Sequence, residues 1–348
     1  VESECRRGAA GGHGFGPPDS RAGLCVIRAW ICAAGGTREV PPAEAMAAAI
    51  AGTGHAWIDI EGGDPAEETD TGTVSEVLAP LQIHPLVLED MVMDINRPKV
   101  DDYGRYLYVV VHSARWDGPR PSLQELDIVV GDRFLLTYHE GETRSVVAAR
   151  EVLARRPDLL GPKPARLLHF LLDVLVDNYL PLVDHVAEEI DGLEEQVFSK
   201  PDTALHERVV RLKRGMSALR RIVGPQRDTV LALTRDEFAA IPAELRPYLR
   251  DVYDRLARVS DLLDSFRDEA ATLLDLHVAV NSNRLNEVIK RLTVIATIGL
   301  PLTVVTSYYG MNFAFPEYQW ANSPLYALGL MAVTALVTWA FLRWRRWL

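Results

Sequence analysis

Cysteine is scarce in this 348-residue chain, and the few copies are confined to one end. Cys5, Cys25 and Cys32 all lie in the first tenth of the chain, and the nine histidines show no metal-ligand spacing around them. An odd number of cysteines without such spacing argues against a disulfide framework and indicates a reducing compartment.

A basic excess and a nucleotide-binding loop are also missing. Lys+Arg total 37 against 48 Asp+Glu, a formal net charge of −11, which argues against nucleic acid as a partner and suits cations. There is no Gly-x-x-x-x-Gly-Lys-Ser/Thr loop and no convincing catalytic constellation, so we do not expect an enzyme. Residues 1–24, rich in glycine and arginine, lack the apolar core of a signal peptide, and we interpret them as a disordered tail.

Charge is absent from two segments near the C-terminal end. Leu292–Tyr309 and Leu325–Leu342 carry no charged residue over 18 residues each. This length is near the lower limit for crossing a hydrocarbon core. One such run could be a buried core helix, whereas two runs about 15 residues apart favour a membrane hairpin.

Basic residues flank this hairpin on its outer sides and are missing from the connecting loop. They are Arg284, Lys290 and Arg291 before the first run and Arg343, Arg345 and Arg346 after the second. The positive-inside rule then places both chain ends in the cytoplasm and the loop outside. We expect a two-span protein of the plasma (inner) membrane, in contact with lipid.

A heptad pattern precedes the first apolar run. Its positions are nearly all apolar: Leu249, Val252, Leu256, Val259, Leu263, Phe266, Ala270, Leu273, His277 and Val280. No Pro or Gly interrupts Tyr248–Ile298, so one helix of roughly 90 Å is expected from Tyr248 to Tyr309. Such a seam serves either packing within one subunit or association between copies. We favour a homo-oligomeric stalk, because two lipid-facing helices cannot enclose a pore.

Polar side chains recur on the later part of this predicted helix. If copies surround an axis, they form rings of acid, amide, hydroxyl and aliphatic groups: Asp275, Asn286, Ile289, Leu292, Thr293, Leu300 and Thr303. Amide and hydroxyl rings suit hydrated Mg²⁺, which dehydrates reluctantly, and aliphatic rings can gate by dewetting. The alternative, that the polar residues merely face the cytosol, is weaker for Thr303, which lies within the span.

At Tyr309–Phe313 the sequence YGMNF resembles the Gly-Met-Asn signature of the CorA family of divalent-cation channels. The tripeptide ends the first apolar run and precedes the loop FPEYQW and the basic tail RWRRWL. Further segments resemble the same family: Ile83–Met91, Asn96–Val111, Leu171–Leu180, Arg250–Leu256 and Asn286–Thr303. The resemblance covers the chain from about residue 25 onward.

The resemblance implies a homopentameric channel with an α+β cytoplasmic funnel domain (an α/β sandwich), a long stalk helix lining the pore and a second transmembrane helix. The expected divisions are a disordered tail (1–24), an α/β domain (25–164), cytoplasmic helices (165–247), the stalk and pore helix (248–309), an external loop (310–323) and a second span with a basic tail (324–348). The residue pattern agrees, with strand-like runs at 24–30, 56–60, 106–112, 125–130 and 134–139 and helical ones at 42–51, 144–154 and 165–235.

By the same resemblance, Gly310, Met311 and Asn312 form the external pore mouth, where Asn312 amides hold hydrated Mg²⁺. Gly310 permits a tight turn. The competing interpretation is a plain helix C-cap, since Gly and Asn both suit that position. Glu317, the single charged residue of the loop, would concentrate cations if five copies gather there; the alternative is a solvent-exposed bystander.

Four acids match positions that hold Mg²⁺ between subunits in the family: Asp90 and Asp251 at one site, and Glu89 and Asp173 at a neighbouring one. Taken singly, each would be an ordinary surface acid. Carboxylates gathered at an interface repel one another, so the resemblance implies that bound Mg²⁺ bridges them and holds the pore closed until cytosolic Mg²⁺ falls.

The expected function is therefore Mg²⁺ influx, with Co²⁺ or Ni²⁺ as further cargo and no organic cofactor. A divalent cation gains about 4.6 kcal/mol per 100 mV of inside-negative potential, so no ATP is needed. Two alternatives stay open. One is a zinc transporter of the same superfamily, whose members often carry Val where this chain has Met311. The other is a membrane-anchored oligomeric sensor that conducts nothing.

Overall fold

The computed structural model describes residues 26–33, 36–62, 78–93, 96–116, 118, 120–156, 163–199, 203–235, 238–311, 316–319, 322–345 and 347. The predicted disordered tail lies outside these residues, as does Asn312. The chain divides into two compact units, treated separately below. The first unit runs to Glu188 and includes Arg211–Arg267; the second comprises Glu189–Val210 and Asp268–Leu348.

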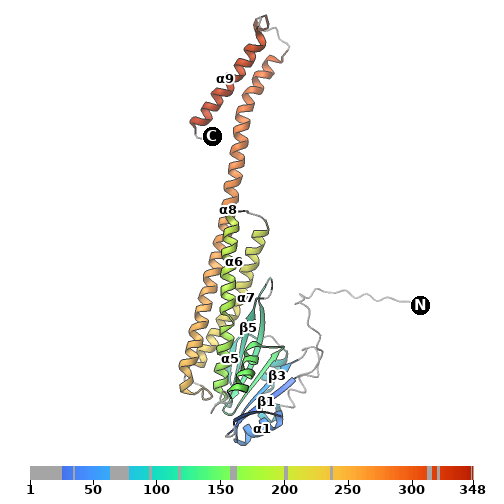
Figure 1. Ribbon diagram of the computed structural model, residues 1–348, viewed down its shortest axis with the longest axis vertical. Coiled ribbons are helices and arrows are strands. Elements are labelled where there is room, and N and C mark those ends of the chain that lie inside the picture. The colour runs from blue at the N-terminus through green and yellow to red at the C-terminus, as the bar shows by residue number, and fades with distance from the viewer. Residues whose placement is uncertain are drawn as a thin grey trace, which may run out of the picture. The chain divides into compact units, whose positions relative to one another are not determined.

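A seven-stranded mixed sheet forms the centre of the first unit, in the order β2-β1-β3-β7-β6-β5-β4 (Figure 1). The strands are β1 (Val26–Ala33), β2 (Gly36–Val40), β3 (His55–Gly62), β4 (Lys99–Asp102), β5 (Tyr106–Arg115), β6 (Ser122–Gly131) and β7 (Phe134–Glu140). β3 and β7 run parallel, and the other paired strands are antiparallel.

The five predicted strands are confirmed, but two strands were not predicted. β2 (GTREV) and β4 (KVDD) are the two edges of the sheet. Both are short and charged, as sheet edges often are, so neither carries the apolar alternation by which a strand is recognised.

The helices are α1 (Pro42–Ala51), α3 (Pro85–Met93), α4 (Arg144–Arg155), α5 (Ala165–Asp177), α6 (Leu180–Ser199), α7 (Thr203–Leu233), α8 (Arg246–Tyr309) and α9 (Ser323–Trp344), with short 3₁₀ turns η1 (Ala79–Leu81), η3 (Ala243–Leu245) and η4 (Pro316–Gln319). The predicted helices at 42–51 and 144–154 are confirmed within one residue. The predicted helix through Tyr248–Tyr309 is confirmed as the 64-residue α8.

Strand pleating assigns the helices to the two faces of the sheet. Ile58 and Ile60 of β3 share a buried apolar cluster with Met46 of α1 and Val87 of α3. Asp59, between them in sequence, points to the opposite face and pairs with Arg150 of α4. Because successive strand residues alternate between faces, α1 and α3 cover one side and α4 the other. This is the layered arrangement expected from the resemblance.

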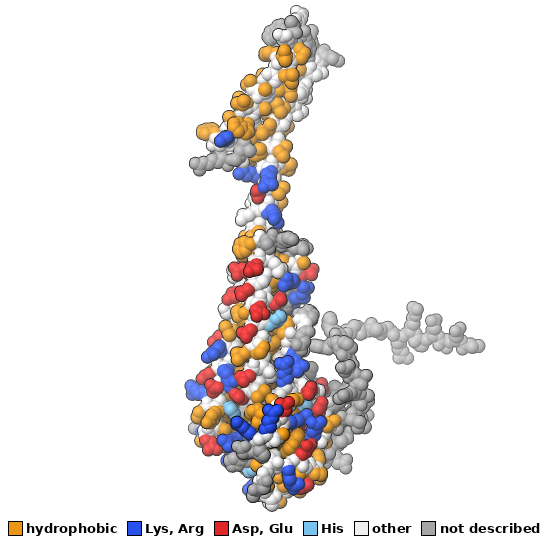
Figure 2. All heavy atoms as spheres, in the orientation of Figure 1, with side chains coloured by type: hydrophobic (Ala, Val, Ile, Leu, Met, Phe, Trp, Pro, Cys, Tyr) orange, Lys and Arg blue, Asp and Glu red, His pale blue; other side chains and the backbone are white. Residues whose placement is uncertain are grey.

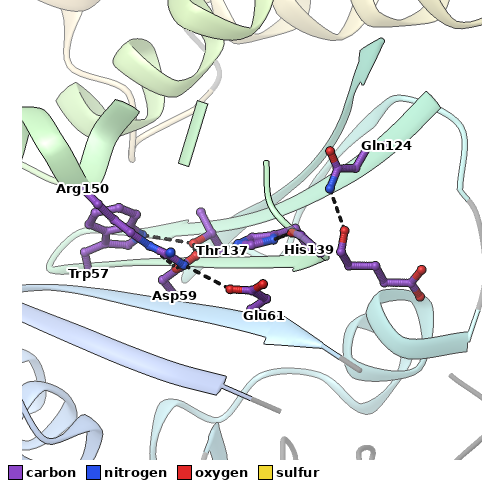
Figure 3. Close-up of polar contacts among 9 residues, drawn as sticks. Trp57, Asp59, Glu61, Gln124, Thr137, His139 and Arg150 are labelled. Carbon is purple, nitrogen blue, oxygen red and sulfur yellow. Dashed lines mark hydrogen bonds and ion pairs between the residues drawn. The ribbon is translucent and has the colours of Figure 1, made fainter. Parts of the chain in front are cut away.

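A buried polar network joins α4 to the sheet (Figure 3). Trp57 Nε1 donates to Thr137 Oγ1 at 3.1 Å, and Thr137 Oγ1 donates to Asp59 Oδ1 at 2.5 Å. His139 Nε2 lies 3.3 Å from the same Asp59 oxygen. Burial alone would raise the pKa of the Asp59 carboxyl, but His139 and Arg150 outweigh burial and hold it below its ordinary value.

The heptad seam of α8 packs inside its own chain, which corrects the expectation that it joins copies. Leu249, Val252, Leu256, Val259 and Leu263 are at most 1% exposed within the first unit. In the second unit the heptad positions Ala270, Leu273 and His277 are buried as well. A seam already covered by the same chain cannot serve as the contact between copies, so this stretch gives no support for association. Beyond it, every side chain from 281 to 292 is exposed.

The second unit contains the uncharged runs of both long helices. The helix through Ala243–Tyr309 and the helix over Pro324–Trp344 are each long and apolar enough to cross a membrane. Of their most apolar stretches, 0% and 6% respectively are buried within the chain. The alternative of a core helix is therefore wrong for both, because a core helix is covered by its own protein. Figure 2 shows hydrophobic side chains spread over these segments.

Candidate functional site

The predicted pore-lining residues lie on the second-unit part of α8. Asp275, Asn286, Ile289, Leu292, Leu300 and Thr303 are exposed, and Thr293 is half-buried. At about 100° per residue, most of them fall within a narrow strip of the helix surface, with Leu292 and Thr303 farther round. Although Thr303 lies farther round, it shares a shallow surface groove with Leu300 and Met311. The groove is lined by Leu300, Thr303, Val304, Ser307, Tyr308 and Met311.

The threonine hydroxyls on this helix are already satisfied as donors. Thr293 Oγ1 donates to the Ile289 carbonyl at 2.8 Å, and Thr303 Oγ1 donates to the Gly299 carbonyl at 3.0 Å. A hydroxyl that donates to its own helix keeps its oxygen lone pairs as acceptors. Lone-pair acceptors of this kind can accept hydrogen bonds from the water shell of a hard cation.

Gly310 follows directly on the last residue of α8. Gly310 N donates to the Thr306 carbonyl at 2.9 Å, so the helical bonding continues through this residue. A Cβ on Gly310 would lie 3.2 Å from the same carbonyl oxygen, which is tight against backbone. Gly310 is not among the described glycines with positive φ, so the left-handed cap on which the C-cap interpretation depends is not formed there.

The remaining pore-mouth residues are described only in part. Met311 is 48% exposed. Asn312 lies outside the described residues, and Glu317 is described in its backbone, within η4, but not in its side chain.

Among the four predicted metal-binding acids, Glu89 and Asp90 belong to α3. Asp90 Oδ2 accepts from Lys99 Nζ at 2.6 Å, and the Asp90 carbonyl accepts from Asn96 Nδ2 at 2.9 Å. Glu89 is exposed. Burial lowers the pKa of the Lys99 ammonium, but the hydrogen bonds and negative charges of Asp90 and Asp101 together outweigh burial and raise it.

The other two acids meet at one guanidinium. Arg255 of α8 contacts Asp173 of α5 and lies 3.2 Å from Asp251 Oδ2, four residues earlier on its own helix. Arg255 Nη1 also donates to Asp177 Oδ1 at 2.5 Å. Burial lowers the pKa of Arg255, yet the hydrogen bond to Asp173 and the charges of Asp173, Asp177 and Asp251 together outweigh burial and raise it.

Sequence reasoning missed Lys99, Asp177 and Arg255. A signal for two of them was present, because Asp177 follows Asp173 by four residues and Arg255 follows Asp251 by four. Residues four apart share a helix face. No comparable spacing points from Lys99 to Asp90, since they lie on different elements.

One chain does not assemble these acids into a metal site. Over the residues that the structure describes, no three His, Cys, Asp or Glu side chains are grouped so as to hold a metal ion. Carboxylate oxygens are the ligands Mg²⁺ prefers, so the donor chemistry fits even though the grouping is incomplete.

A polar network extends from Lys99 into the sheet. Its ammonium lies 5.1 Å from the centre of the Tyr108 ring, and the Tyr108 hydroxyl donates to Asp127 Oδ1 at 2.6 Å. Burial and the neighbouring Glu125 carboxylate raise the pKa of Asp127 well above its ordinary value. Burial therefore disfavours the charged form of Asp127.

Comparison with known sequences agrees with the resemblance. The sequence model of the family described as CorA-like Mg2+ transporter protein matches residues 53–346. The cobalt/magnesium transport protein CorA of Thermotoga maritima is 35% identical over 296 residues, which cover 84% of this chain and 83% of that protein. The zinc transport protein ZntB of Cronobacter sakazakii is 27% identical over 276 residues, which cover 76% and 80%.

Comparison with solved structures gives the same fold. The complete structure of the CorA magnesium transporter from Methanocaldococcus jannaschii superposes with a TM-score of 0.78 over 91% of this chain and 97% of that chain. Its sequence identity is 16%. The likeness therefore shows the fold, including the mixed sheet, the long helix and the two apolar C-terminal helices.

Proposed function

Because this chain belongs to the family of CorA-like Mg²⁺ transporter proteins, we propose that it is a Mg²⁺ influx channel driven by the membrane potential. It assembles as a homopentamer in the plasma (inner) membrane, with both chain ends in the cytoplasm and the domain boundaries predicted above. Co²⁺ and Ni²⁺ are further cargo, in keeping with the cobalt and magnesium named for the relative from Thermotoga maritima.

The observation that carries this proposal is the course of α8. This single helix begins among the acids of the first unit, near Asp251, and ends in an exposed apolar segment next to Met311. Copies of this helix around an axis would line a path with Asp275, Asn286, Thr293 and similar side chains. The Asn312 amides would bind hydrated Mg²⁺ at the outer mouth, and Glu317 would attract it there.

Regulation is assigned to the acids of the first unit. Asp90 and Asp251, with Glu89 and Asp173 beside them, would hold cytosolic Mg²⁺ between neighbouring copies and keep the pore closed. Charge repulsion between unbridged carboxylates supports this role, because loss of the ion would loosen the contact.

The test is Mg²⁺ uptake by liposomes that carry the purified protein and an entrapped Mg²⁺-sensitive dye, with an imposed inside-negative potential. We expect uptake that grows with the potential and is lost in Asn312→Ala. Asn322→Ala is the matched control, because it makes the same change elsewhere in the same external loop and should leave uptake intact. Equal loss in both variants would contradict the role of Asn312, and a silent wild type in Mg²⁺-free vesicles would contradict the channel.

Zinc transport is the second candidate, and the 27% identity to ZntB favours testing it. The same vesicles loaded with a Zn²⁺-sensitive dye compare the two cargoes directly. Uptake of Zn²⁺ without Mg²⁺ would move the assignment to the zinc branch. Absence of both, with Co²⁺ and Ni²⁺ also excluded, would favour the non-conducting sensor.

A further inference from the structure

Each predicted metal-binding region of the first unit already contains a cation from the same chain. On α3, Asp90 is paired with Lys99 at 2.6 Å. On α5 and α8, Asp173 and Asp251 are both paired with Arg255. We infer that Lys99 and Arg255 are internal counter-cations that Mg²⁺ must displace, and that they thereby set the Mg²⁺ concentration to which the channel responds.

The geometry at Arg255 places its positive charge between Asp173 and Asp251, two of the acids assigned to regulation. Three carboxylates from two helices converge on one guanidinium, with Nη2 directed at Asp173 and Asp251 and Nη1 at Asp177. The Arg255 side chain is 22% exposed, whereas those of Asp173, Asp177 and Asp251 are 35%, 56% and 71% exposed. The cation therefore lies beneath the acids, and the acids are the part that an ion arriving from solution meets first.

The pair on α3 repeats this arrangement with a different base. Lys99 Nζ lies 2.6 Å from Asp90 and 3.4 Å from Asp101, and both Lys99 and Asp90 side chains are 33% exposed. Lys99 is on the edge strand β4, which β5 holds in register through its pairing with Val110. This pairing fixes the backbone position from which the Lys99 side chain reaches Asp90.

These contacts have a consequence for metal affinity. A carboxylate oxygen that accepts a charge-assisted hydrogen bond offers less charge to a metal, and a fixed positive charge repels an approaching Mg²⁺. Removing the base should therefore strengthen Mg²⁺ binding, whereas removing a merely structural ion pair would weaken the fold without changing the Mg²⁺ dependence. Because ion pairs that are this exposed contribute little, we expect the Mg²⁺ concentration needed for binding to change by about two- to fivefold.

The experiment measures how much Mg²⁺ protects the full-length protein, in detergent at fixed ionic strength, from limited digestion by chymotrypsin. This protease does not cut at Lys or Arg, so the substitutions leave its sites in place. We expect Lys99→Gln and Arg255→Gln each to lower the half-protecting Mg²⁺ concentration by about two- to fivefold. Arg255→Lys, which keeps the charge, should stay near wild type.

Arg38→Gln is the matched control. Arg38 lies on β2, at the sheet edge opposite β4, and forms an ion pair with Glu44 of α1 at 2.5 Å. It should leave the Mg²⁺ dependence unchanged. If Arg255→Gln does not fold, Lys99→Gln tests the same inference on a separate element.

This inference rests on the proposed regulatory role of the acids, and the outcomes separate the two. A wild type protected by Mg²⁺, with unchanged or higher half-protecting concentrations in the Gln variants, overturns the inference and leaves the proposed regulation standing. A wild type without any Mg²⁺ protection overturns the proposed regulation and the inference with it.

Discussion

Arg150 of α4 forms an ion pair with Asp59 of β3, a carboxylate that is completely buried in the sheet (Figure 3). Arg150 Nε donates to Asp59 Oδ2 at 3.0 Å, and the Arg150 side chain is 17% exposed. The pair connects α4 to β3 and, through the polar network around Asp59, to the neighbouring strand β7. It therefore contributes to the scaffold that supports α5 and the acids of the first unit.

Arg150→Met should destabilise the protein by up to about 3–5 kcal/mol, because the buried Asp59 carboxylate loses its guanidinium and keeps only Thr137 and His139 as partners. Thermal unfolding in detergent micelles measures the change. Arg155→Met, at an exposed position on the same helix, is the control and should have little effect. Combining Arg150→Met with Asp59→Asn should recover part of the loss; no recovery would mean that the cost is not electrostatic.

Gly215→Ala should destabilise the protein by about 1–3 kcal/mol through overpacking. An added Cβ on this α7 residue would lie 2.6 Å from Cη2 of Trp116, which itself packs near His185 with ring centroids 5.6 Å apart. Gly192→Ala in α6 has nothing within 4 Å of the new Cβ and should stabilise by about 0.5–1 kcal/mol. Unfolding midpoints that move in the same direction for both variants would contradict this assignment.

Asp127→Asn should stabilise the protein relative to wild type, and increasingly so as the pH rises. Burial and Glu125 raise the pKa of Asp127 in the folded protein. The protonated carboxyl therefore stabilises the folded state fully below the unfolded pKa of about 3.9, and this stabilisation is lost as the pH rises toward the folded pKa. The free energy of unfolding of the wild type should fall by at most about 1.4 kcal/mol per pH unit. Asparagine still accepts from Tyr108 but does not titrate. Unfolding midpoints of the two proteins from pH 4 to pH 8 should diverge; parallel curves would rule the effect out.

Glu317→Gln should reduce Mg²⁺ uptake at low external ionic strength by a few-fold, with the difference shrinking as salt screens the loop. Uptake by the vesicles described above, measured over a series of external KCl concentrations, checks this. Glu287→Gln is the control, since Glu287 is an exposed acid on α8 that pairs with Arg291 at 2.6 Å on the predicted cytoplasmic side. A salt response equal in both variants would contradict a role at the outer mouth.

The sequence alone determined the features that depend on local pattern. Two uncharged runs predicted the apolar helices, the uninterrupted stretch after Tyr248 predicted α8, and alternation predicted the five longer strands. Hydropathy and period are properties of neighbouring residues, so they can be read without knowing the fold. The edge strands β2 and β4 escaped because charge and short length remove that pattern.

Only the tertiary structure decided which surfaces meet. The heptad from Leu249 to His277 is equally suited to a partner copy and to the same chain, and folding buries all of its positions except Phe266 within the chain. Arg255 reaches Asp173 and Asp177 across about 80 residues, and Lys99 reaches Asp90 from a different element. Sequence spacing does not encode such long-range pairs, because they arise when packed helices and strands bring separate segments together.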